Sequence, residues 1–212
     1  MPRRVIKLGG SLLDFKHLAP RLRTWLAAQP PMPSVIVAGG GRLADAIRDA
    51  YAVHRLDEEA AHWLCIRLLG VTAELLARLL PEAVLLRQFD DLLARIDETS
   101  LTIFDPEQFL REEACLLKRS GAKGLAPLPH SWDVTSDSIA ARLAAVLHAD
   151  ELVLFKSSLP SSPATLQQAA DNGYLDRYFP TAAADLSRIR CVNLRSDAFA
   201  ETTLWVGPSS YA

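Results

Sequence analysis

The sequence predicts an α/β fold around a parallel β-sheet, and three apolar runs with their endings are the main reasons. Residues 5–8 form a short, mostly apolar run that Gly9 and Gly10 stop, and residues 35–38 run into three further glycines. Each run is followed by apolar residues at helical spacing. A buried strand, a glycine turn and a helix, twice within fifty residues, is typical of a parallel α/β sheet. A third apolar run, residues 152–155, ends at Lys156.

Length and composition are those of an ordinary globular protein. The chain has 212 residues, of which 50% are hydrophobic and 23% are charged, and its formal net charge is −2. We therefore expect a single domain, residues 1–212, with no nucleic-acid partner. No apolar run approaches the ~18 residues that a membrane span requires, so we expect no membrane partner.

Cysteine usage and the N-terminus indicate the cytoplasm. Cys65, Cys115 and Cys191 are odd in number and widely spaced, so they predict neither a zinc site nor a disulfide framework. Free thiols of this kind suit a reducing compartment. The chain enters its first strand almost at once, so we expect no signal peptide.

The remaining apolar patterns predict further elements in chain order. Helical spacing covers residues 18–26, 43–51, 57–80, 92–96, 139–147 and 166–170, with another helix start at residues 105–107. Strand-like runs cover residues 83–86, 101–104, 189–194 and 203–206. Residues 118–132 and 157–163 contain glycines, serines and prolines, and we predict loops there.

The first strand carries the first candidate site. Lys7 lies two residues before Gly9 and Gly10, near the carboxyl end of the strand, and Ser11 follows. Glycines let backbone amides approach an anion closely, a serine can donate its hydroxyl or cap the next helix, and lysine adds positive charge. The pattern predicts a phosphate site; the alternative is a tight turn beside a surface lysine. Because the chain has only five lysines, those at strand ends are informative.

The glycines at positions 39, 40 and 41 allow three interpretations. Residues 39–44 satisfy the dinucleotide fingerprint G-x-G-x-x-G/A, but the acidic residues 57–59 begin a helix instead of ending a strand, so this interpretation fails on context. The second is a turn that only packs a helix on a strand. We favour the third, in which the amides of the turn and the helix N-terminus face the same anion as Gly9 and Gly10. The chain has no G-x-x-x-x-G-K-[ST], which excludes a P-loop.

Two further patterns lie in the second half of the chain. Thr135 and Ser136 are candidate caps of the helix that follows them. Asp137 is either a helix-dipole residue in the first turn or a carboxylate that holds catalytic lysines. Lys156 is either a surface lysine or a second cation at the carboxyl ends of parallel strands, where open α/β sheets bind ligands.

The order of these motifs resembles the amino acid kinase family. The motifs are a strand-end lysine with Gly-Gly-Ser, a strand entering Gly-Gly-Gly, Thr-Ser-Asp at a helix start and a strand closing on lysine. The family includes acetylglutamate, aspartate, carbamate, uridylate and isopentenyl phosphate kinases. Residues 128–141 and 60–63 look most like one branch, small kinases that act on an aminomethylfuran phosphate in methanofuran biosynthesis. The resemblance covers most of residues 4–157.

The resemblance implies a three-layer αβα sandwich with a mainly parallel sheet, in a homodimer or higher homo-oligomer. ATP with Mg²⁺ and a small phosphorylated acceptor would lie end to end across the strand ends. Residues 1–150 would form the acceptor and phosphoryl-transfer part, and residues 151–212 a shortened nucleotide side. The resemblance assigns catalysis to Lys7, Asp137 and Lys156, phosphate and nucleotide binding to Gly9, Gly10, Ser11 and Lys156, and acceptor binding to Gly39, Gly40, Gly41 and Arg42.

Such a reaction needs little covalent chemistry from the protein. An acceptor phosphate oxygen is already anionic at neutral pH, so catalysis consists of positioning and of charge neutralisation by lysines, amides and Mg²⁺. We predict no metal ligand from the chain itself. An acceptor that carries an amine would want a carboxylate, and Asp57 or Glu58, beside His62 and Trp63, are the candidates. The alternative for His62 and Trp63 is a helix packing face.

The chain departs from the family pattern after Lys156. Many relatives have an Asp-Gly nucleotide loop there, whereas this chain has Ser157–Pro160 and no later lysine. A second hypothesis is therefore a degenerate relative that binds an anion as a sensor or as a subunit of a larger assembly. A third is a uridylate-type kinase.

Overall fold

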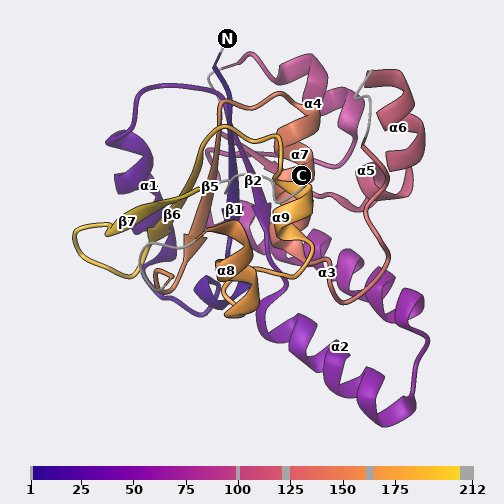
Figure 1. The fold of residues 1–212 in the computed structure, drawn as a ribbon. Coiled ribbons are helices and arrows are strands. Elements are labelled where there is room, and N and C mark those ends of the chain that lie inside the picture. Colours follow the sequence, from indigo (N-terminus) through magenta and orange to yellow (C-terminus); the bar gives the residue numbers. More distant parts are fainter. Residues whose placement is uncertain (1, 99–100, 121–124, 161–164, 206–212) are drawn as a thin grey trace.

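The computed structural model describes residues 2–98, 101–120, 125–160 and 165–205, and they form a seven-stranded sheet of order β3-β4-β2-β1-β5-β6-β7 (Figure 1). The strands are β1 Arg4–Leu8, β2 Ser34–Ala38, β3 Val84–Leu86, β4 Leu101–Phe104, β5 Glu151–Lys156, β6 Ile189–Asn193 and β7 Glu201–Leu204. All neighbouring strands are parallel except β6 and β7. The prediction of a mainly parallel sheet is confirmed.

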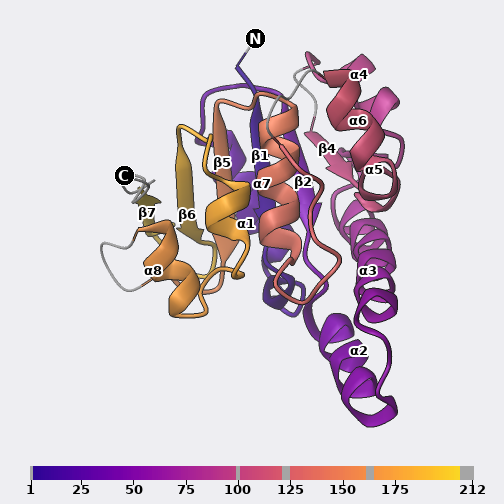
Figure 2. The ribbon, with the colours of Figure 1, turned by 45° about the vertical axis from the view of Figure 1, so that its right-hand side comes forward.

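Helices cover both faces of this sheet, which confirms the three-layer αβα sandwich. They are η1 Gly10–Leu12, α1 Leu18–Ala27, α2 Gly41–His54, α3 Glu58–Leu79, α4 Phe89–Arg95, α5 Glu107–Arg111, α6 Glu113–Ser120, α7 Ser136–Val146, α8 Leu166–Asp171 and α9 Phe179–Ala182. α7 lies over β1 and β5 on one face, and α1 lies on the opposite face (Figure 2).

The two-residue period of the strands decides which side chains meet α7. Val5, Leu152 and Leu154 pack in one apolar cluster with α7, whereas Ile6 and Val153 belong to the cluster on the other face. Lys7 and Lys156 share the parity of the first group. Because side chains alternate between the faces of a strand, both lysines project toward the α7 side of the sheet.

Helix α3 is long and apolar enough to cross a membrane by length and composition. In this fold it packs against the sheet, with Ile66 and Leu69 buried in the α7-side cluster and Ala73 and Leu76 in the other. Helix α2 is different, because none of its residues is buried and it extends away from the sheet (Figure 1).

Several sequence expectations for local structure need correction. Residues 118–120, predicted as loop, end helix α6, and α9 was not predicted at all. Ser11 caps no helix, since η1 begins after Gly9 without a side-chain cap. Part of the expected final strand, residue 206, lies outside the described residues.

Candidate active site

A carboxylate flanked by two ammonium groups lies where β1, β5 and α7 meet. Lys7 Nζ is 2.7 Å from Asp137 Oδ1, and Lys156 Nζ is 2.7 Å from Asp137 Oδ2. Lys7 comes from β1, Lys156 ends β5, and Asp137 is the second residue of α7. Lys7 and Asp137 are only 5% and 4% exposed, and the Lys156 side chain retains 15% exposure. We call these three residues the ion-pair triad.

Burial and charge act in opposite directions within the triad. Burial, together with the charge of Lys156, lowers the pKa of Lys7 to about 8, against the attraction of Asp137. Burial alone would raise the pKa of Asp137, but the two ammonium groups outweigh it and lower that pKa to about 2. At neutral pH the triad therefore holds one negative and two positive charges, an excess of positive charge that suits an anion.

The two glycine turns touch each other through their backbones. A Cβ on Gly10 would lie 2.0 Å from the amide nitrogen of Gly41, and Gly41 has φ of +55°. Any other residue at position 10 would therefore force the turns apart, and position 41 is in the left-handed region that favours glycine. The amides of Gly9 and Gly39 donate to Phe155 O and Leu8 O, both at 2.8 Å. These two amides continue the sheet.

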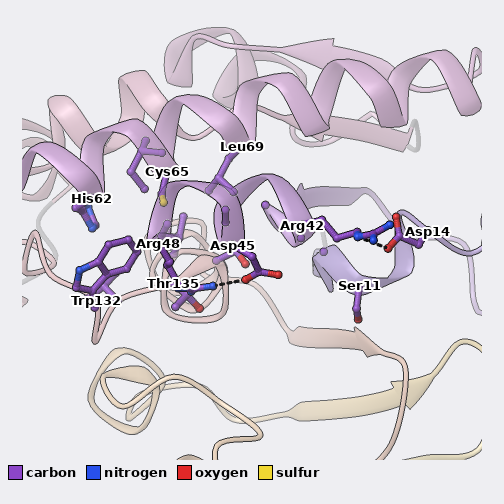
Figure 3. A pocket seen from close by; sticks show the side chains of 18 residues that line it. Ser11, Asp14, Arg42, Asp45, Arg48, His62, Cys65, Leu69, Trp132 and Thr135 are labelled. Carbon is purple, nitrogen blue, oxygen red and sulfur yellow. Dashed lines mark hydrogen bonds and ion pairs between the residues drawn. The ribbon is translucent and has the colours of Figure 1, made fainter. Parts of the chain in front are cut away.

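A cavity of about 330 Å³ opens beside the glycine turns (Figure 3). It is bounded by η1, α2, α3 and the loop that leads into α7. The lining residues are Gly10, Ser11, Asp14, Gly40, Gly41, Arg42, Ala44, Asp45, Arg48, His62, Cys65, Ile66, Leu69, Trp132, Val134, Thr135, Ser136 and Ile139. Of the predicted phosphate and acceptor residues, Gly9, Gly39, Asp57 and Lys156 do not line it. The other two members of the triad do not line it either, although Ser136, next to Asp137 in the chain, does.

An aromatic and charged wall closes the end of the cavity away from the glycine turns. Trp132 stands across from His62, with Arg48 and Asp45 between them and the turns (Figure 3). Arg48 donates to Asp45 at 2.8 Å and lies 5.4 Å from the centre of the Trp132 ring. Tyr51 packs edge-on against Trp132 at 5.3 Å. The sequence singled out His62 but missed Trp132, Asp45 and Arg48 as lining residues.

The carboxylates predicted to face an acceptor amine have structural partners instead. Asp57 caps α3 by accepting from Ala60 N at 2.9 Å, and Glu58 accepts from Trp132 N at 2.9 Å. His62 is buried, with Nδ1 3.2 Å from Ser131 O, and burial lowers its pKa. Glu58 and His62 thus fix the loop that presents Trp132. Arg42 lines the cavity near its rim, 3.9 Å from Asp14.

Lys156 and the segments that surround the triad also have partners that come late in the chain. Lys156 Nζ donates to Tyr174 O at 2.9 Å, and Ser11 Oγ lies 3.3 Å from Ser157 Oγ. Asp176 accepts from Thr135 N at 2.9 Å across a separation of 41 residues. Sequence reasoning missed Tyr174 and Asp176, because their contacts with Lys156 and with the start of α7 join residues that are far apart in the sequence.

The described residues hold no group of three His, Cys, Asp or Glu side chains that is arranged to bind a metal ion. Both oxygens of Asp137 are already engaged by ammonium groups. The part of the chain that the structure describes therefore offers Mg²⁺ no protein cage.

Comparison with known proteins agrees with this architecture. Residues 2–158 match the sequence model of the amino acid kinase family. Over 154 residues the chain is 27% identical to the [5-(aminomethyl)furan-3-yl]methyl phosphate kinase of Methanocaldococcus jannaschii, a match that covers 71% of this chain and 63% of that protein. The chain thus matches less than two thirds of the length of that relative.

Solved structures with the same fold are more distant in sequence. UMP kinase from Ureaplasma parvum superposes with a TM-score of 0.59 at 16% identity, over 92% of this chain and 91% of its own. For UMP kinase from Bacillus anthracis the TM-score is 0.61 at 14% identity, over 97% and 100%. For aspartate kinase from Synechocystis it is 0.62 at 16% identity, over 95% of this chain and 40% of that one. At these identities the likeness concerns the fold alone.

Proposed function

Because the chain belongs to the amino acid kinase family, we propose that it is a kinase that transfers a phosphoryl group from ATP to a small phosphorylated acceptor. The ion-pair triad carries this proposal. It concentrates two cations at the carboxyl ends of adjacent parallel strands. The turn of Gly9 and Gly10 lies against Lys156, and Gly10 in turn lines the cavity of about 330 Å³. Parallel sheets bind ligands at this edge.

The geometry suggests a division of labour along the strand ends. Lys7 and the Gly10 turn would stabilise the phosphoryl group in transit, and Gly40 and Gly41 at the start of α2 would hold the acceptor phosphate. Lys156, which is the more exposed of the two lysines, would contact the nucleotide phosphates. Residues 1–150 would thus carry the acceptor, and residues 151–212 the nucleotide side of one domain.

The chemistry needs no general base from the protein. ATP would supply the phosphoryl group, and the acceptor oxygen is anionic before it reacts. Asp137 holds both ammonium groups in place, and its charge favours the ammonium form of Lys7. Since the described residues offer no metal cage, Mg²⁺ would arrive on the nucleotide phosphates, as it commonly does.

Among acceptors we favour an aminomethylfuran phosphate. The match to the Methanocaldococcus jannaschii kinase supports this choice, as does a cavity with a glycine turn at one end and an aromatic wall at the other. Trp132 offers a ring to a flat heterocycle. Asp45, and neither Asp57 nor Glu58, is the carboxylate that lines the wall.

The direct test is ADP release in the presence of ATP, Mg²⁺ and candidate acceptors. We expect release that depends on the aminomethylfuran phosphate, and a fall of ~10²-fold or more in turnover for Lys7→Ala. Release that depends instead on UMP would favour a uridylate-type kinase. Wild-type turnover in folded Lys7→Ala would remove Lys7 from the mechanism.

One observation favours a different class of function. The family match ends at residue 158, just after β5, so residues 159–212, most of the proposed nucleotide side, lie outside it. A degenerate relative that binds an anion, as a sensor or as a subunit of a larger assembly, would keep the ion-pair triad and lose the ability to bind ATP. Calorimetry with ATP and Mg²⁺ separates the two: binding supports the kinase, and no heat at millimolar nucleotide supports the sensor.

We also propose that the protein is a homo-oligomer. Three exposed apolar residues of α3, Leu64, Val71 and Leu75, follow one side of the helix opposite its buried face. Their spacing of seven and four residues matches the recurrence that helices use to pack against each other. Sedimentation equilibrium should report at least a dimer, and Val71→Glu should shift it toward the monomer.

A further inference from the structure

The segment between α8 and α9 grips the helix turn that carries Asp137. Asp176 Oδ2 accepts from Thr135 N at 2.9 Å, from Thr135 Oγ1 at 2.8 Å and from Ser138 N at 3.0 Å. Its other oxygen accepts from Ser138 Oγ. Thr135 is the N-cap of α7 and Ser138 its third residue. Asp137 lies between them, so Asp176 fixes the turn on both sides of it.

The same segment also holds the second lysine of the triad. The carbonyl of Tyr174 accepts from Lys156 Nζ at 2.9 Å, and its ring centre lies 5.0 Å from that nitrogen. At this distance an ammonium group is attracted to an aromatic face. Tyr178 N donates to Asp133 O at 3.0 Å, which ties the far end of the segment to the loop before α7. Five consecutive residues thus touch both Lys156 and the turn of Asp137.

Asp176 also acts on the charge of Lys7. The groups that act on Lys7 are Asp137 and Asp176, which raise its pKa, and Lys156, which lowers it. Asp176 is half-buried, and its own pKa is raised by burial and by the charge of Asp137. Four donors to one carboxylate favour its ionised form. These hydrogen bonds thus oppose the effect of burial on Asp176, and the position of its carboxyl group decides how strongly it acts on Lys7.

We propose that Asp176 is a positioning residue of the ion-pair triad, which clamps the first turn of α7 so that Asp137 faces both lysines while Tyr174 tethers Lys156. Its effect on turnover rests on the proposed kinase function. Its effect on the lysines does not, because the contacts exist without substrate. The stretch after β5, which lies outside the family match of residues 2–158, is thereby part of the catalytic apparatus.

The test compares Asp176→Asn with Asp185→Asn, a matched change at an exposed carboxylate of the same region. Lysines labelled with ¹³C at Cε are titrated by NMR, and the five lysines of the chain make assignment by single substitutions practical. In Asp176→Asn we expect Lys7 to titrate at lower pH, since a carboxylate that favours its ammonium form is gone, and turnover to fall by ~10²-fold. Asp185→Asn should match the wild type in both.

The two readouts keep the inference separate from the proposed function. A shifted Lys7 titration in a protein that has no kinase activity would uphold the positioning role and reject the kinase. A Lys7 titration and turnover equal to those of the wild type would overturn the positioning role. Should Asp176→Asn fail to fold, Ser138→Ala removes one donor and retains the carboxylate. A displaced titration of Lys7 or Lys156 in that variant supports the proposal, and wild-type titrations overturn it.

Discussion

Replacing Asp137 with Asn is expected to destabilise the protein by an amount that grows as the pH falls. The variant keeps the shape of the side chain and removes the charge that faces two ammonium groups at 2.7 Å. Because Lys7 is only 5% exposed, water cannot replace the carboxylate as the partner of its ammonium group. A buried lysine in this situation lowers its pKa further and gives up its proton.

The sign and the size follow from linkage. In the wild type the pKa of Lys7 is lowered from 10.5 to about 8, so burial of its charge costs stability below pH 8, and that cost is relieved as the pH rises toward 10.5. Without Asp137 the pKa drops again, and the extra cost at a given pH is limited by the free energy of deprotonating Lys7. That limit is ~1.4 kcal/mol for each pH unit below 8, hence ~1.4 kcal/mol at pH 7 and ~3.4 kcal/mol at pH 5.5.

Urea unfolding of the wild type and Asp137→Asn between pH 5.5 and pH 8 measures this difference. The expected result is a stability gap that widens by up to ~1.4 kcal/mol per pH unit toward acid. Asp133→Asn is the matched control, because Asp133 is exposed and its nearest cation, Arg177, is 3.8 Å away. A gap that stays constant across this pH range would refute the assignment of Lys7 as a buried cation that depends on Asp137.

Three further predictions concern activity and substrate binding. The alkaline limb of kcat/KM should lie near the Lys7 pKa of about 8, and in Lys7→Arg a pH–rate profile should show no limb there, since arginine stays charged. Gly10→Ala should cost ~10²-fold or more in turnover, because its Cβ would lie 2.0 Å from Gly41 N and force the turns apart; steady-state kinetics check this. Trp132→Ala should raise the KM of the acceptor ~10-fold or more and leave that of ATP unchanged.

Each of these has a control or a contrary outcome. Retention of the alkaline limb in Lys7→Arg would assign it to another group. For Gly10→Ala, a turnover equal to that of the wild type would count against the contact of the two turns. The matched control for Trp132→Ala is Trp205→Ala, because Trp205 is 65% exposed. An unaltered acceptor KM in Trp132→Ala would contradict the role of this ring in binding the acceptor.

The parallel sheet could be predicted because its signals are local. Apolar runs, glycine turns and helical spacing all lie within a few residues of one another. Helix α6 was not predicted because its support is distant: Glu113 forms a buried ion pair with Arg142 at 2.8 Å and accepts from Leu128 N at 2.7 Å. The glycines and prolines beyond residue 120 led to a predicted loop that included residues 118–120, which belong to α6.

The same distinction holds for the site. The sequence could nominate Lys7, Asp137 and Lys156 because each occupies a marked position, at a strand end or a helix start. It could not find Asp176, whose partners are 38 and 41 residues away. It read Asp57 as an acceptor ligand because a carboxylate at a helix start fits two roles, and in the structure this one caps the helix.

The alternation that points Lys7 toward α7 has a consequence for changes in chain length. Lys7 pairs with Leu154, and its neighbours Ile6 and Leu8 point into the cluster that contains Trp25. Deleting one residue from β1 would turn the ammonium group into that apolar cluster and bring a hydrocarbon side chain to the carboxylate. Insertions and deletions within the five residues of β1, Arg4–Leu8, should therefore abolish activity. They should be tolerated in loops that connect the elements, for example between α1 and β2.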